Sequence, residues 1–459
     1  MRHYDLVVLG AGTGNALIDD RFAGVDVAIV SAGPFGGTCL NAGCIPSKML
    51  VATADVADAV RDAGRHGVDA QLRQVRWRDV RSRVFGRLDT EAAEGEEGRR
   101  ASDHITVYRG LARFTGDRRL TVDTADGAVE IEAERIVIAA GGRPVVPPVV
   151  EDSGLPYETS DTVMRLDELP QRLVVLGGGY VAAELAHVFR SFGSHVTVVE
   201  KGERLLGQQQ DEAVSAAFTD AMRDQWDLRL GRELTAVSGR PGDLRLTLDD
   251  GTELRADTLL VAVGRRPNSD LLDLHRAGID TGEDGRVTVD AQLRTTAEGV
   301  WALGDVSTPV PLKHVANREA RIVAHNLLHP GRERTMNYDA VPSAVFTRPQ
   351  IAQVGLTEQE ARDRKLDYAV AVHRYADVAY GWALEDTEGF CKVIADRRTG
   401  RLIGAHLFGP QAATLVQSLV VALTTGMTAA ELAEGPLWIH PALTEVVENA
   451  LRDLDTVRT

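Results

Sequence analysis

The chain has 459 residues, of which 44% are hydrophobic and 26% charged, a composition typical of a soluble globular protein with about three domains. Its 51 basic and 67 acidic residues give a formal charge of −16, which argues against a nucleic-acid or anionic-membrane partner. No apolar run approaches the roughly 20 residues of a bilayer span, and the strand-like start leaves no room for a signal peptide. We therefore expect a cytoplasmic protein.

The first apolar run, "YDLVVL", leads into the glycine cluster "GAGTGN", then a helix-like stretch, then a second apolar run, "VDVAIV". This order predicts the strand–helix–strand unit of a dinucleotide-binding fold. Gly10 would permit the tight turn, Gly12 would let the backbone approach a pyrophosphate, and amides at the start of the helix would support that group. Gly14 and Asn15 occupy the region of the third glycine. Ser31 stands where an acidic residue normally binds the ribose.

The stretch "FGGTCLNAGCIPSK" carries two of the three cysteines, Cys39 and Cys44. Three roles are open for this pair: a structural disulfide, a metal site, or a disulfide that is made and broken in turnover. A reducing cytosol does not sustain structural disulfides, and a metal site needs more than two cysteine ligands. Cys391 lies far along the chain, where we expect a small buried hydrophobe on a strand. We therefore expect no metal site, and redox chemistry remains for the pair.

Five residues of regular helix rise about 7.5 Å, more than the usual Cα separation of a disulfide. Cys39 and Cys44 therefore cannot both lie in one regular helix when bonded. Gly43 gives the backbone freedom to distort, and Pro46 suits the first turn of a helix that starts here. A thiol at a helix N-terminus has a lowered pKa, and Lys48 adds a nearby positive charge. The pair is suited to repeated reduction and reoxidation.

The pattern of the first unit returns as "RLVVLGGGYVAAELAHVF", followed by the apolar run "SHVTVVE". Two copies in the correct order indicate two dinucleotide-binding units. Gly177 and Gly179 match the first two glycines of the other unit, and Ala182 takes the third position. Glu200 ends the second apolar run, at the position of the ribose-binding acid. Glu184, midway along the helix, is by itself typical of a solvated helix face.

Two later apolar runs end in the similar sequences Gly-Gly-Arg-Pro, from Gly141, and Gly-Arg-Arg-Pro, from Gly264. We interpret them as the ends of the two nucleotide units, where the chain passes between domains. A further strand, "TTAEGVWALGDVS", breaks near Asp305. After about Asn337 the pattern changes to strands and helices without a glycine fingerprint. The fold class we expect is α/β, with two Rossmann-like dinucleotide-binding domains and a C-terminal α+β domain.

Near the end, "LWIHPALTEVVENALR" puts His440 before a proline and Glu445 five residues later. A histidine that donates one ring N–H to a carboxylate is oriented to move a proton. A surface histidine near an unrelated glutamate would give the same spacing, so both interpretations stay open from these residues alone.

Together, the GGTCLNAGCIPSK motif, the two glycine units, the Gly-Asp near Asp305 and the terminal HPxxxE resemble the flavoprotein disulfide reductases, which include lipoamide dehydrogenase and glutathione reductase. The resemblance covers essentially the whole chain. It implies one FAD per subunit, NADPH or NADH as electron donor, a small-molecule disulfide substrate and a homodimer whose active site is completed by the partner subunit. The implied domains are FAD-binding (1–150 and 265–336), NAD(P)H-binding (151–264) and dimerisation (337–459).

The resemblance also implies catalytic roles. Cys44 would be the charge-transfer thiolate beside the flavin, and Cys39 would attack the substrate disulfide. His440, oriented by Glu445, would protonate the departing thiol.

Lys48 and Glu184 would meet beside the flavin, which replaces the surface interpretation of Glu184, and Tyr180 would gate access to the flavin. The residues implied for FAD binding are Gly10, Gly12, Gly14, Asn15, Ser31, Gly37, Thr38, Lys48, Gly141 and Asp305. Those implied for NAD(P)H binding are Gly177, Gly179, Tyr180, Ala182, Glu200, Lys201 and Gly264.

Several segments, among them "SDTVMRLDELP", "DVAYGWALEDTEG" and "GPLWIHPALTEVVENAL", are most similar to the family members that reduce mycothione, the disulfide of mycothiol. Mycothione is therefore the implied substrate, and dihydrolipoamide dehydrogenase activity is the alternative. The resemblance implies NADPH, and Lys201 and Arg204 are candidate cations for its 2′-phosphate. Glu200 favours the free 2′-hydroxyl of NADH instead. We expect an enzyme that uses both carriers.

Overall fold

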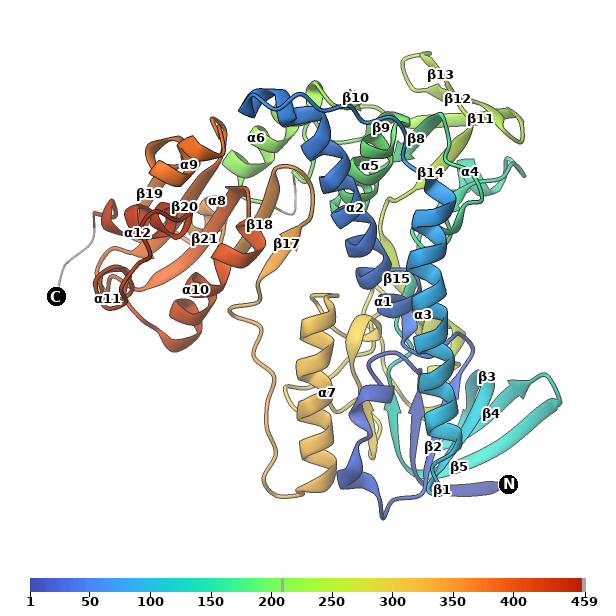
Figure 1. Ribbon diagram of the computed structural model, residues 1–459. Coiled ribbons are helices and arrows are strands. Elements are labelled where there is room, and N and C mark those ends of the chain that lie inside the picture. The colour runs from blue at the N-terminus through green and yellow to red at the C-terminus, as the bar shows by residue number, and fades with distance from the viewer. Residues whose placement is uncertain (208–209, 456–459) are drawn as a thin grey trace.

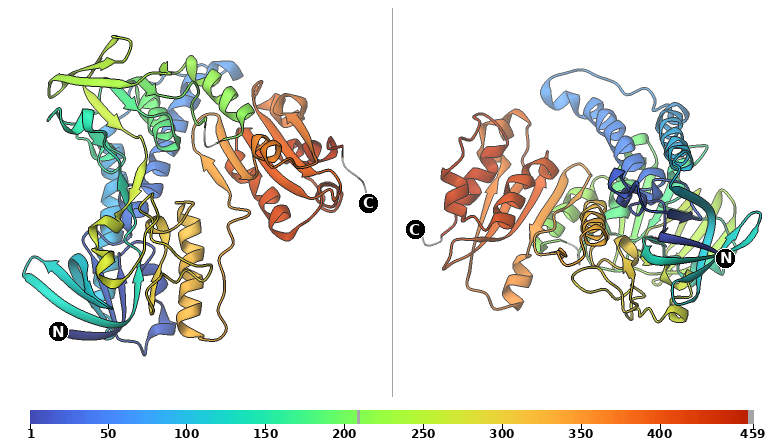
Figure 2. Two further views of the ribbon diagram at one scale, coloured as in Figure 1. Left: turned by 180° about the vertical axis from the view of Figure 1, so that it is seen from behind. Right: turned by 90° about the horizontal axis from the view of Figure 1, so that it is seen from below.

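The computed structural model describes residues 1–207 and 210–455. Figure 1 shows three bodies: one at the bottom with the N-terminus, one at the top, and one at the left with the C-terminus. Both views of Figure 2 keep the C-terminal body to one side of the other two. The first two bodies are built on parallel sheets and the third on an antiparallel sheet, which confirms the expected fold class. Within the described ranges, no helix is long and apolar enough to cross a membrane.

The first body is built on parallel strands in the order β3-β2-β1-β5-β16, and β4 joins β3 to β5 by antiparallel pairing. The inner strands read as continuous apolar runs because both faces of the sheet are covered. Helix α7 (Lys313–Leu328) packs on one face through its own apolar residues. The strands are β1 (Arg2–Leu9), β2 (Val27–Ser31), β3 (Ile105–Gly116), β4 (Arg119–Thr124), β5 (Gly127–Ile138) and β16 (Val300–Ala302).

The expected α-helix after the first glycine cluster is wrong. The segment forms two 3₁₀ turns instead, η1 (Asn15–Leu17) and η2 (Asp20–Phe22). The Asp19 side chain accepts a hydrogen bond from the Arg21 amide and starts the second turn, as short polar side chains do when they compete with a helix. Arg99 of α3 (Trp77–Arg100) donates to the carbonyl oxygens of Asn15 and Ile18, at 2.9 and 2.8 Å, which satisfies groups that a helix would have paired.

The second body has a fully parallel sheet in the order β10-β9-β8-β14-β7. Here the glycine turn does lead into a helix, α5 (Tyr180–Phe192). A small antiparallel sheet, β11-β12-β13, flanks it, and the two Arg-Pro runs pair with each other as β6 and β15. The strands are β6 (Gly142–Pro144), β7 (Glu158–Thr159), β8 (Arg172–Leu176), β9 (His195–Glu200), β10 (Asp227–Leu230), β11 (Leu234–Arg240), β12 (Asp243–Leu248), β13 (Glu253–Ala256), β14 (Thr258–Val261) and β15 (Arg265–Pro267).

The third body is an antiparallel sheet in the order β17-β18-β21-β20-β19 with helices packed against it. Cys391 on β20 is fully buried, and burial raises its pKa to about 12, as expected for a cysteine that acts as a hydrophobe. The strands are β17 (Ser343–Val345), β18 (Gln350–Gly355), β19 (Tyr368–Arg374), β20 (Phe390–Asp396) and β21 (Leu402–Gly409). The helices are α8 (Glu358–Asp363), α9 (Ala379–Ala383), α10 (Ala412–Thr425), α11 (Ala429–Glu434) and α12 (Thr444–Arg452).

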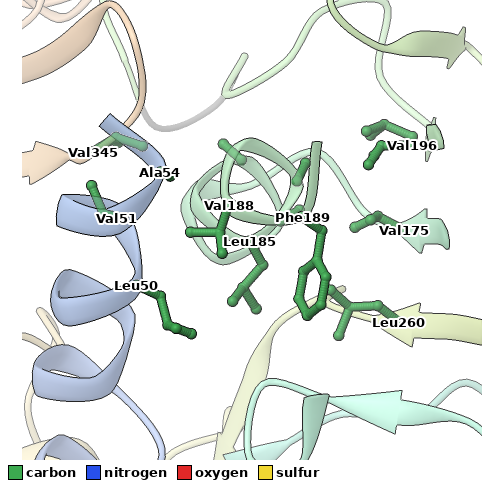
Figure 3. Close-up of a cluster of buried hydrophobic side chains, with 14 of the residues drawn as sticks. Leu50, Val51, Ala54, Val175, Leu185, Val188, Phe189, Val196, Leu260 and Val345 are labelled. Atoms are coloured by element: carbon green, nitrogen blue, oxygen red, sulfur yellow. The ribbon is translucent and has the colours of Figure 1, made fainter. Parts of the chain in front are cut away.

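One hydrophobic core joins the three bodies. Helix α2 (Cys44–Asp62) packs along α5, and Figure 3 shows Leu50 and Val51 of α2 near Leu185 and Val188 of α5, with Val345 of the third body beside them. The helix that begins with Cys44 is therefore fixed against the second body. The remaining elements are α1 (Gly37–Asn41), α4 (Pro148–Glu151), α6 (Glu212–Arg223), η3 (Ala63–His66), η4 (Val163–Arg165), η5 (Asn268–Leu271), η6 (Leu274–Ala277), η7 (Gly304–Val306) and η8 (Tyr375–Asp377).

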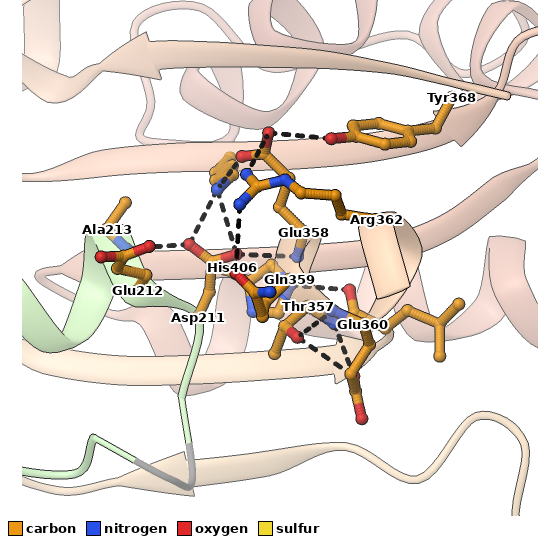
Figure 4. A network of polar contacts seen from close by, with 12 residues as sticks. Asp211, Glu212, Ala213, Thr357, Glu358, Gln359, Glu360, Arg362, Tyr368 and His406 are labelled. Carbon is orange, nitrogen blue, oxygen red and sulfur yellow. Dashed lines mark hydrogen bonds and ion pairs between the residues drawn. The ribbon is translucent and has the colours of Figure 1, made fainter. Parts of the chain in front are cut away.

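A buried ion cluster holds the second and third bodies together (Figure 4). Lys392 Nζ of β20 lies 2.8 and 3.0 Å from the two carboxylate oxygens of Asp211, and 2.6 Å from Glu358 Oε2. Lys392 is 4% exposed and Asp211 1%. Burial by itself raises the pKa of Asp211, but hydrogen bonds from Lys392 and the Glu358 amide outweigh it and leave the pKa lowered. The hydrogen bond from Lys392 likewise lowers the pKa of Glu358.

We predict that Lys392→Met destabilises the protein by about 3–5 kcal/mol at neutral pH, because two carboxylates lose their buried cation. In the wild type both carboxyls have a lower pKa folded than unfolded. The stability they add is therefore complete above the unfolded values, about 4, and is lost as pH falls through the folded values. The variant lacks this contribution at every pH. The difference in free energy of unfolding between wild type and variant should therefore be smaller in acid than at neutral pH. Urea unfolding followed by tryptophan fluorescence, at neutral pH and near pH 3.5, measures the deficit.

Lys365→Met is the matched control, since Lys365 is exposed and forms no ion pair within the described ranges. It should leave the unfolding midpoint unchanged at both pH values. A Lys392→Met deficit of equal size at both pH values would contradict the assignment.

Candidate active site

The two redox-motif cysteines lie on different helices. Cys39 is on the short helix α1, and Cys44 is the first residue of the 19-residue helix α2. Between them Gly43 has the non-helical angles φ −136° and ψ −114°, so the helix breaks as the sequence predicted. Both thiols are free.

The surroundings of the two cysteines shift the pKa values of their thiols in opposite directions. A hydrogen bond from the Cys39 thiol and the positive charges of Lys48 and Lys313 lower the pKa of Cys44 to about 7. The same hydrogen bond, together with burial, raises the pKa of Cys39. The start of α2 adds its dipole to the stabilisation of a Cys44 anion. At a pH near 7 the Cys44 thiol is therefore about half ionised, while the thiol of Cys39 keeps its proton.

Lys48 and Glu184 meet, as the family resemblance implied. Lys48 Nζ lies 2.5 Å from Glu184 Oε2, and Glu184 is only 7% exposed. The other carboxylate oxygen accepts the backbone N–H of Phe346 at 3.0 Å, and Lys48 Nζ sits 4.7 Å from the centre of the Phe346 ring. The solvated-face interpretation of Glu184 is wrong, because α2 covers that face of α5.

The histidine and glutamate near the C-terminus are hydrogen-bonded. His440 Nδ1 lies 2.7 Å from Glu445 Oε1, and this bond lowers the pKa of Glu445. The side chain of His440 is 71% exposed. In Figure 1 the start of α12, just after this histidine, lies far from the start of α2. Within one chain the structure therefore does not bring His440 to the cysteines.

The two glycine turns have matching geometry. Gly10 has φ +116° and a Cβ there would lie 2.2 Å from the carbonyl oxygen of Ala139, while Gly177 has φ +110° and a Cβ there would lie 2.5 Å from that of Ala262. Both positions require glycine. A Cβ on Gly37, at the start of α1, would lie 2.7 Å from the Cα of Gly12, so the first turn lies directly against α1.

The other residues implied for FAD binding lie around this turn or at the ends of the first sheet. Ser31 ends β2 and donates to the Gly33 carbonyl oxygen at 3.0 Å, and the Asn15 side chain accepts from Arg99 at 2.7 Å. Asp305 lies in η7, and burial raises its pKa although Arg265 and Lys313 oppose the rise. No cation forms an ion pair with Asp305 within the described ranges. A half-buried carboxylate and a glycine-lined backbone turn suit the hydroxyl and phosphate groups of a dinucleotide such as FAD. Gly12 and Gly14 lie on the same turn, Thr38 is in helix α1, and Gly141 lies between β5 and β6.

The residues implied for NAD(P)H binding cluster at the carboxyl ends of β8, β9 and β14. Glu200 ends β9 and accepts the backbone N–H groups of Gly178, at 2.5 Å, and Gly202, at 2.7 Å. Lys201, directly after Glu200, is exposed and its Nζ lies 3.2 Å from Glu233 Oε2. Burial raises the pKa of Tyr180 at the start of α5. Gly179, Ala182 and Gly264 complete the set on the turn, on α5 and after β14.

Sequence reasoning missed three residues that shape the site. Glu319 is fully buried on α7 and accepts hydrogen bonds from the Gly304 amide and the Tyr338 hydroxyl, both at 2.7 Å, which fixes the turn that carries Asp305. Phe346 supplies an amide and a ring to the Lys48–Glu184 pair. Lys313 could have been noticed from composition. Only five of the 51 basic residues are lysines and the other 46 are arginines, so each lysine is an unusual choice in this sequence.

Comparison with known proteins supports the interpretation over the whole chain. The family described as "Pyridine nucleotide-disulphide oxidoreductase" matches residues 4–320, and its dimerisation domain matches residues 341–451. Mycothione reductase of Mycobacterium tuberculosis is 51% identical over 99% of this chain and 100% of its own length. Dihydrolipoyl dehydrogenase of Halobacterium salinarum is 33% identical over 97% of this chain and 95% of its own length.

Solved structures of flavoprotein disulfide reductases have the same fold as this chain. The flavoprotein disulfide reductase RclA of Escherichia coli superposes with a TM-score of 0.87, at 29% identity, over 98% of this chain and 99% of its own. LpdA of Mycobacterium tuberculosis gives 0.86 at 25% identity over 98% and 99%. Enzymes of this family use FAD and NAD(P)H, which confirms the expected cofactors. The chain therefore belongs to the pyridine nucleotide-disulphide oxidoreductase family and is an FAD-dependent disulfide reductase.

Proposed function

We propose that this chain reduces mycothione with electrons from NAD(P)H, through FAD and the Cys39–Cys44 pair. The observation that carries the proposal is the pair of free cysteines, with Cys44 at the start of α2 beside the Lys48–Glu184 ion pair and Cys39 on the adjoining helix α1. The relatives named mycothione reductase, at 51% identity over essentially both whole chains, support the substrate. Dihydrolipoamide dehydrogenase activity is supported less well, because the dihydrolipoyl dehydrogenases of Halobacterium salinarum and Haloferax volcanii are each 33% identical to this chain.

The reduced pair has two separable tasks. A histidine takes the proton of Cys39, and the Cys39 sulfur attacks one sulfur of mycothione. A mixed disulfide forms, the sulfur–sulfur bond of mycothione breaks, and the first mycothiol leaves with the proton that the histidine returns. The Cys44 thiolate then attacks the Cys39 sulfur, forms the Cys39–Cys44 disulfide and releases the second mycothiol. The chemistry that bound FAD supplies is to take a hydride from NAD(P)H and return an electron pair to this disulfide. Lys48, held by Glu184, keeps positive charge beside Cys44.

The sequence motifs also assign the binding of FAD and of NAD(P)H to separate segments of the chain. Segments 1–150 and 265–336 would hold FAD through the first glycine turn, with Asp305 on its ribityl chain. Segment 151–264 would bind NAD(P)H on the second glycine turn, with Tyr180 covering the path to the flavin. Segment 337–459 would form the dimer. A cytoplasmic location suits free, redox-active thiols, which a reducing compartment keeps cycling.

A second copy of the chain would complete the active site. The exposed His440 is flanked by Leu437, 101% exposed, and Ile439, 73% exposed, and Trp382 of the same body is 65% exposed. Exposed apolar side chains of this size mark a surface that is covered in an assembly. A homodimer would bury them and bring the partner subunit's His440 to Cys39.

We predict that the purified, FAD-containing protein reduces mycothione with a kcat/KM at least about tenfold above its values for lipoamide and glutathione disulfide, a margin of about 1.4 kcal/mol in transition-state binding. Cys39→Ser should abolish turnover of all three disulfides and serves as the control. Steady-state oxidation of NAD(P)H with each disulfide measures the ratios. Preference for lipoamide would favour the alternative function.

We predict that mixing Cys39→Ser and His440→Ala subunits restores about one quarter of wild-type turnover. Half of the dimers are then mixed, and each mixed dimer has one intact site if His440 acts across the interface. Each variant alone should be nearly inactive. Subunit exchange is verified by native mass spectrometry, and no recovery in mixed dimers would show that the histidine acts within its own chain.

We predict that the enzyme uses both NADPH and NADH and that Glu200 limits the use of NADPH. Its carboxylate, fixed by two backbone amides, favours a free 2′-hydroxyl and repels a 2′-phosphate. Glu200→Ala should raise the NADPH/NADH ratio of kcat/KM by about tenfold, within the 1–3 kcal/mol of a charged hydrogen bond. Lys201→Ala should lower the ratio, because it removes a cation near the 2′-phosphate.

Glu200→Gln is the matched variant, since it removes the charge and keeps an acceptor for one amide. It should move the ratio in the same direction as Glu200→Ala. If neither variant changes the ratio, Glu200 does not face the ribose.

A further inference from the structure

The side chain of Asn41, the last residue of α1, holds the turn between the two cysteines. Its Nδ2 donates hydrogen bonds to the carbonyl oxygens of Phe35 and Gly37, both at 2.9 Å. Asn41 is 8% exposed, so water replaces these bonds poorly if they break. The amide therefore ties the end of α1 back to the segment before the helix.

Both carbonyl groups that accept these bonds are fixed in the first body. The Phe35 side chain is 1% exposed and packs in the same apolar core as β1 and α7. A Cβ on Gly37 would lie 2.7 Å from the Cα of Gly12, so the start of α1 contacts the first glycine turn directly. A five-residue helix has little stability of its own. The end of α1 therefore takes its position from the core of the first body, through the Asn41 amide.

The turn that follows Asn41 needs such a restraint, because Gly43 has no side chain and leaves the backbone free. Two further contacts reach the turn. The Ala42 amide donates to the Thr38 carbonyl oxygen at 2.9 Å, but this bond lies within the same short segment. Arg165 Nη2 lies 3.5 Å from the Asn41 carbonyl oxygen, the length of a weak hydrogen bond. The two short bonds of the Asn41 side chain link the turn to the segment before α1 more firmly than either contact.

We propose that Asn41 is a positioning residue of the redox pair, which restrains α1 so that the Cys39 sulfur stays within reach of Cys44. Asn41 lies two residues after Cys39 and three before Cys44, so any loosening of the turn changes how the two sulfurs approach each other. A disulfide is more stable relative to its dithiol when the backbone already holds both sulfurs close together, because less freedom is lost when the bond forms. The restraint therefore lowers the reduction potential of the pair.

The same restraint assists the last step of the proposed reaction. In that step the Cys44 sulfur bonds to the Cys39 sulfur and the bond from Cys39 to the mycothiol sulfur breaks. The mycothiol leaves with the electron pair of that bond and gains a proton. A Cys39 sulfur held near Cys44 is attacked at a high effective concentration. The inference thus rests on the proposed function of the pair, but not on which disulfide is the substrate.

The test measures the equilibrium between the disulfide and the dithiol in the FAD-containing protein. Anaerobic buffers at neutral pH hold graded ratios of reduced to oxidised dithiothreitol. Each exchange turns the enzyme disulfide into two thiols and one dithiothreitol into its cyclic disulfide. Rapid alkylation and mass spectrometry then quantify both forms of the peptide that carries Cys39 and Cys44. Asn41→Ala should shift the equilibrium about tenfold toward the dithiol, which raises the reduction potential by about 30 mV.

Two further variants separate positioning from general stability. Asn41→Leu fills a similar volume without a donor and should give the same shift as Asn41→Ala. Asn326→Ala is the matched control, since Asn326 is 6% exposed near the end of α7. Its side chain accepts the Arg334 backbone N–H at 2.7 Å and donates to the Arg334 carbonyl oxygen at 3.0 Å. This variant should leave the equilibrium unchanged, because the carboxyl end of α7 lies away from α1 (Figure 1).

Reduction of ferricyanide by NAD(P)H takes electrons from the flavin without the cysteines and should stay unchanged in the Asn41 variants. If Asn41→Ala does not fold or lacks this activity, Asn41→Leu carries the test. If both fail, Asn41 has a general structural role and the proposal falls.

An unchanged equilibrium in the Asn41 variants, a shift toward the disulfide, or an equal shift in Asn326→Ala would also overturn the proposal. The measurement needs no mycothione, so it succeeds or fails separately from the substrate assignment. If the wild-type pair forms no disulfide, the proposed function falls as well. If the disulfide forms and the Asn41 variants leave its equilibrium unchanged, the positioning role alone falls.

Discussion

The ion pair between Lys48 and Glu184 is the interaction on which the geometry of the site depends. It joins α2 of the first body to α5 of the second, and Phe346 of the third body closes it with an amide and an aromatic ring. A largely buried carboxylate is costly unless its oxygens are satisfied, and here both are. The three bodies must therefore meet correctly before the cation beside Cys44 is in place.

Apolar packing around this ion pair also fixes the orientation of α2, and with it the position of Cys44. Leu50 and Ala54 on α2 repeat at helical spacing and are fully buried, so α2 has one rotational setting against α5. That setting fixes the direction of the helix start and hence of Cys44. Lys392, which clamps the third body onto the second, limits how far Phe346 can move from the pair. A shared apolar core and two buried ionic contacts thus both link the bodies.

The reactive groups lie on two separate surfaces of one chain. The cysteines are at the junction of the bodies, where cations and a helix start favour an anion. His440 is exposed on the third body, with its ring oriented by Glu445. A proton carrier on an exposed, apolar-flanked face is suited to a neighbouring copy. In the proposed homodimer, one subunit would set the electrostatics of the cysteine pair and the other would supply the proton carrier.

The sequence by itself determined the features that depend on local backbone chemistry. Gly10 and Gly177 mark turns that no side chain can enter, Gly43 breaks the helix between the cysteines, and the alternation of apolar runs predicts both parallel sheets. The helix after Gly14 was wrongly expected, because Arg99, some eighty residues away, satisfies the carbonyl groups of two 3₁₀ turns. Tertiary structure alone decided the partner of Glu184 and the hydrogen bond from Lys313 to Thr13. Contacts between residues more than a hundred positions apart leave no periodic trace in the sequence, and only the packing of the three bodies creates them.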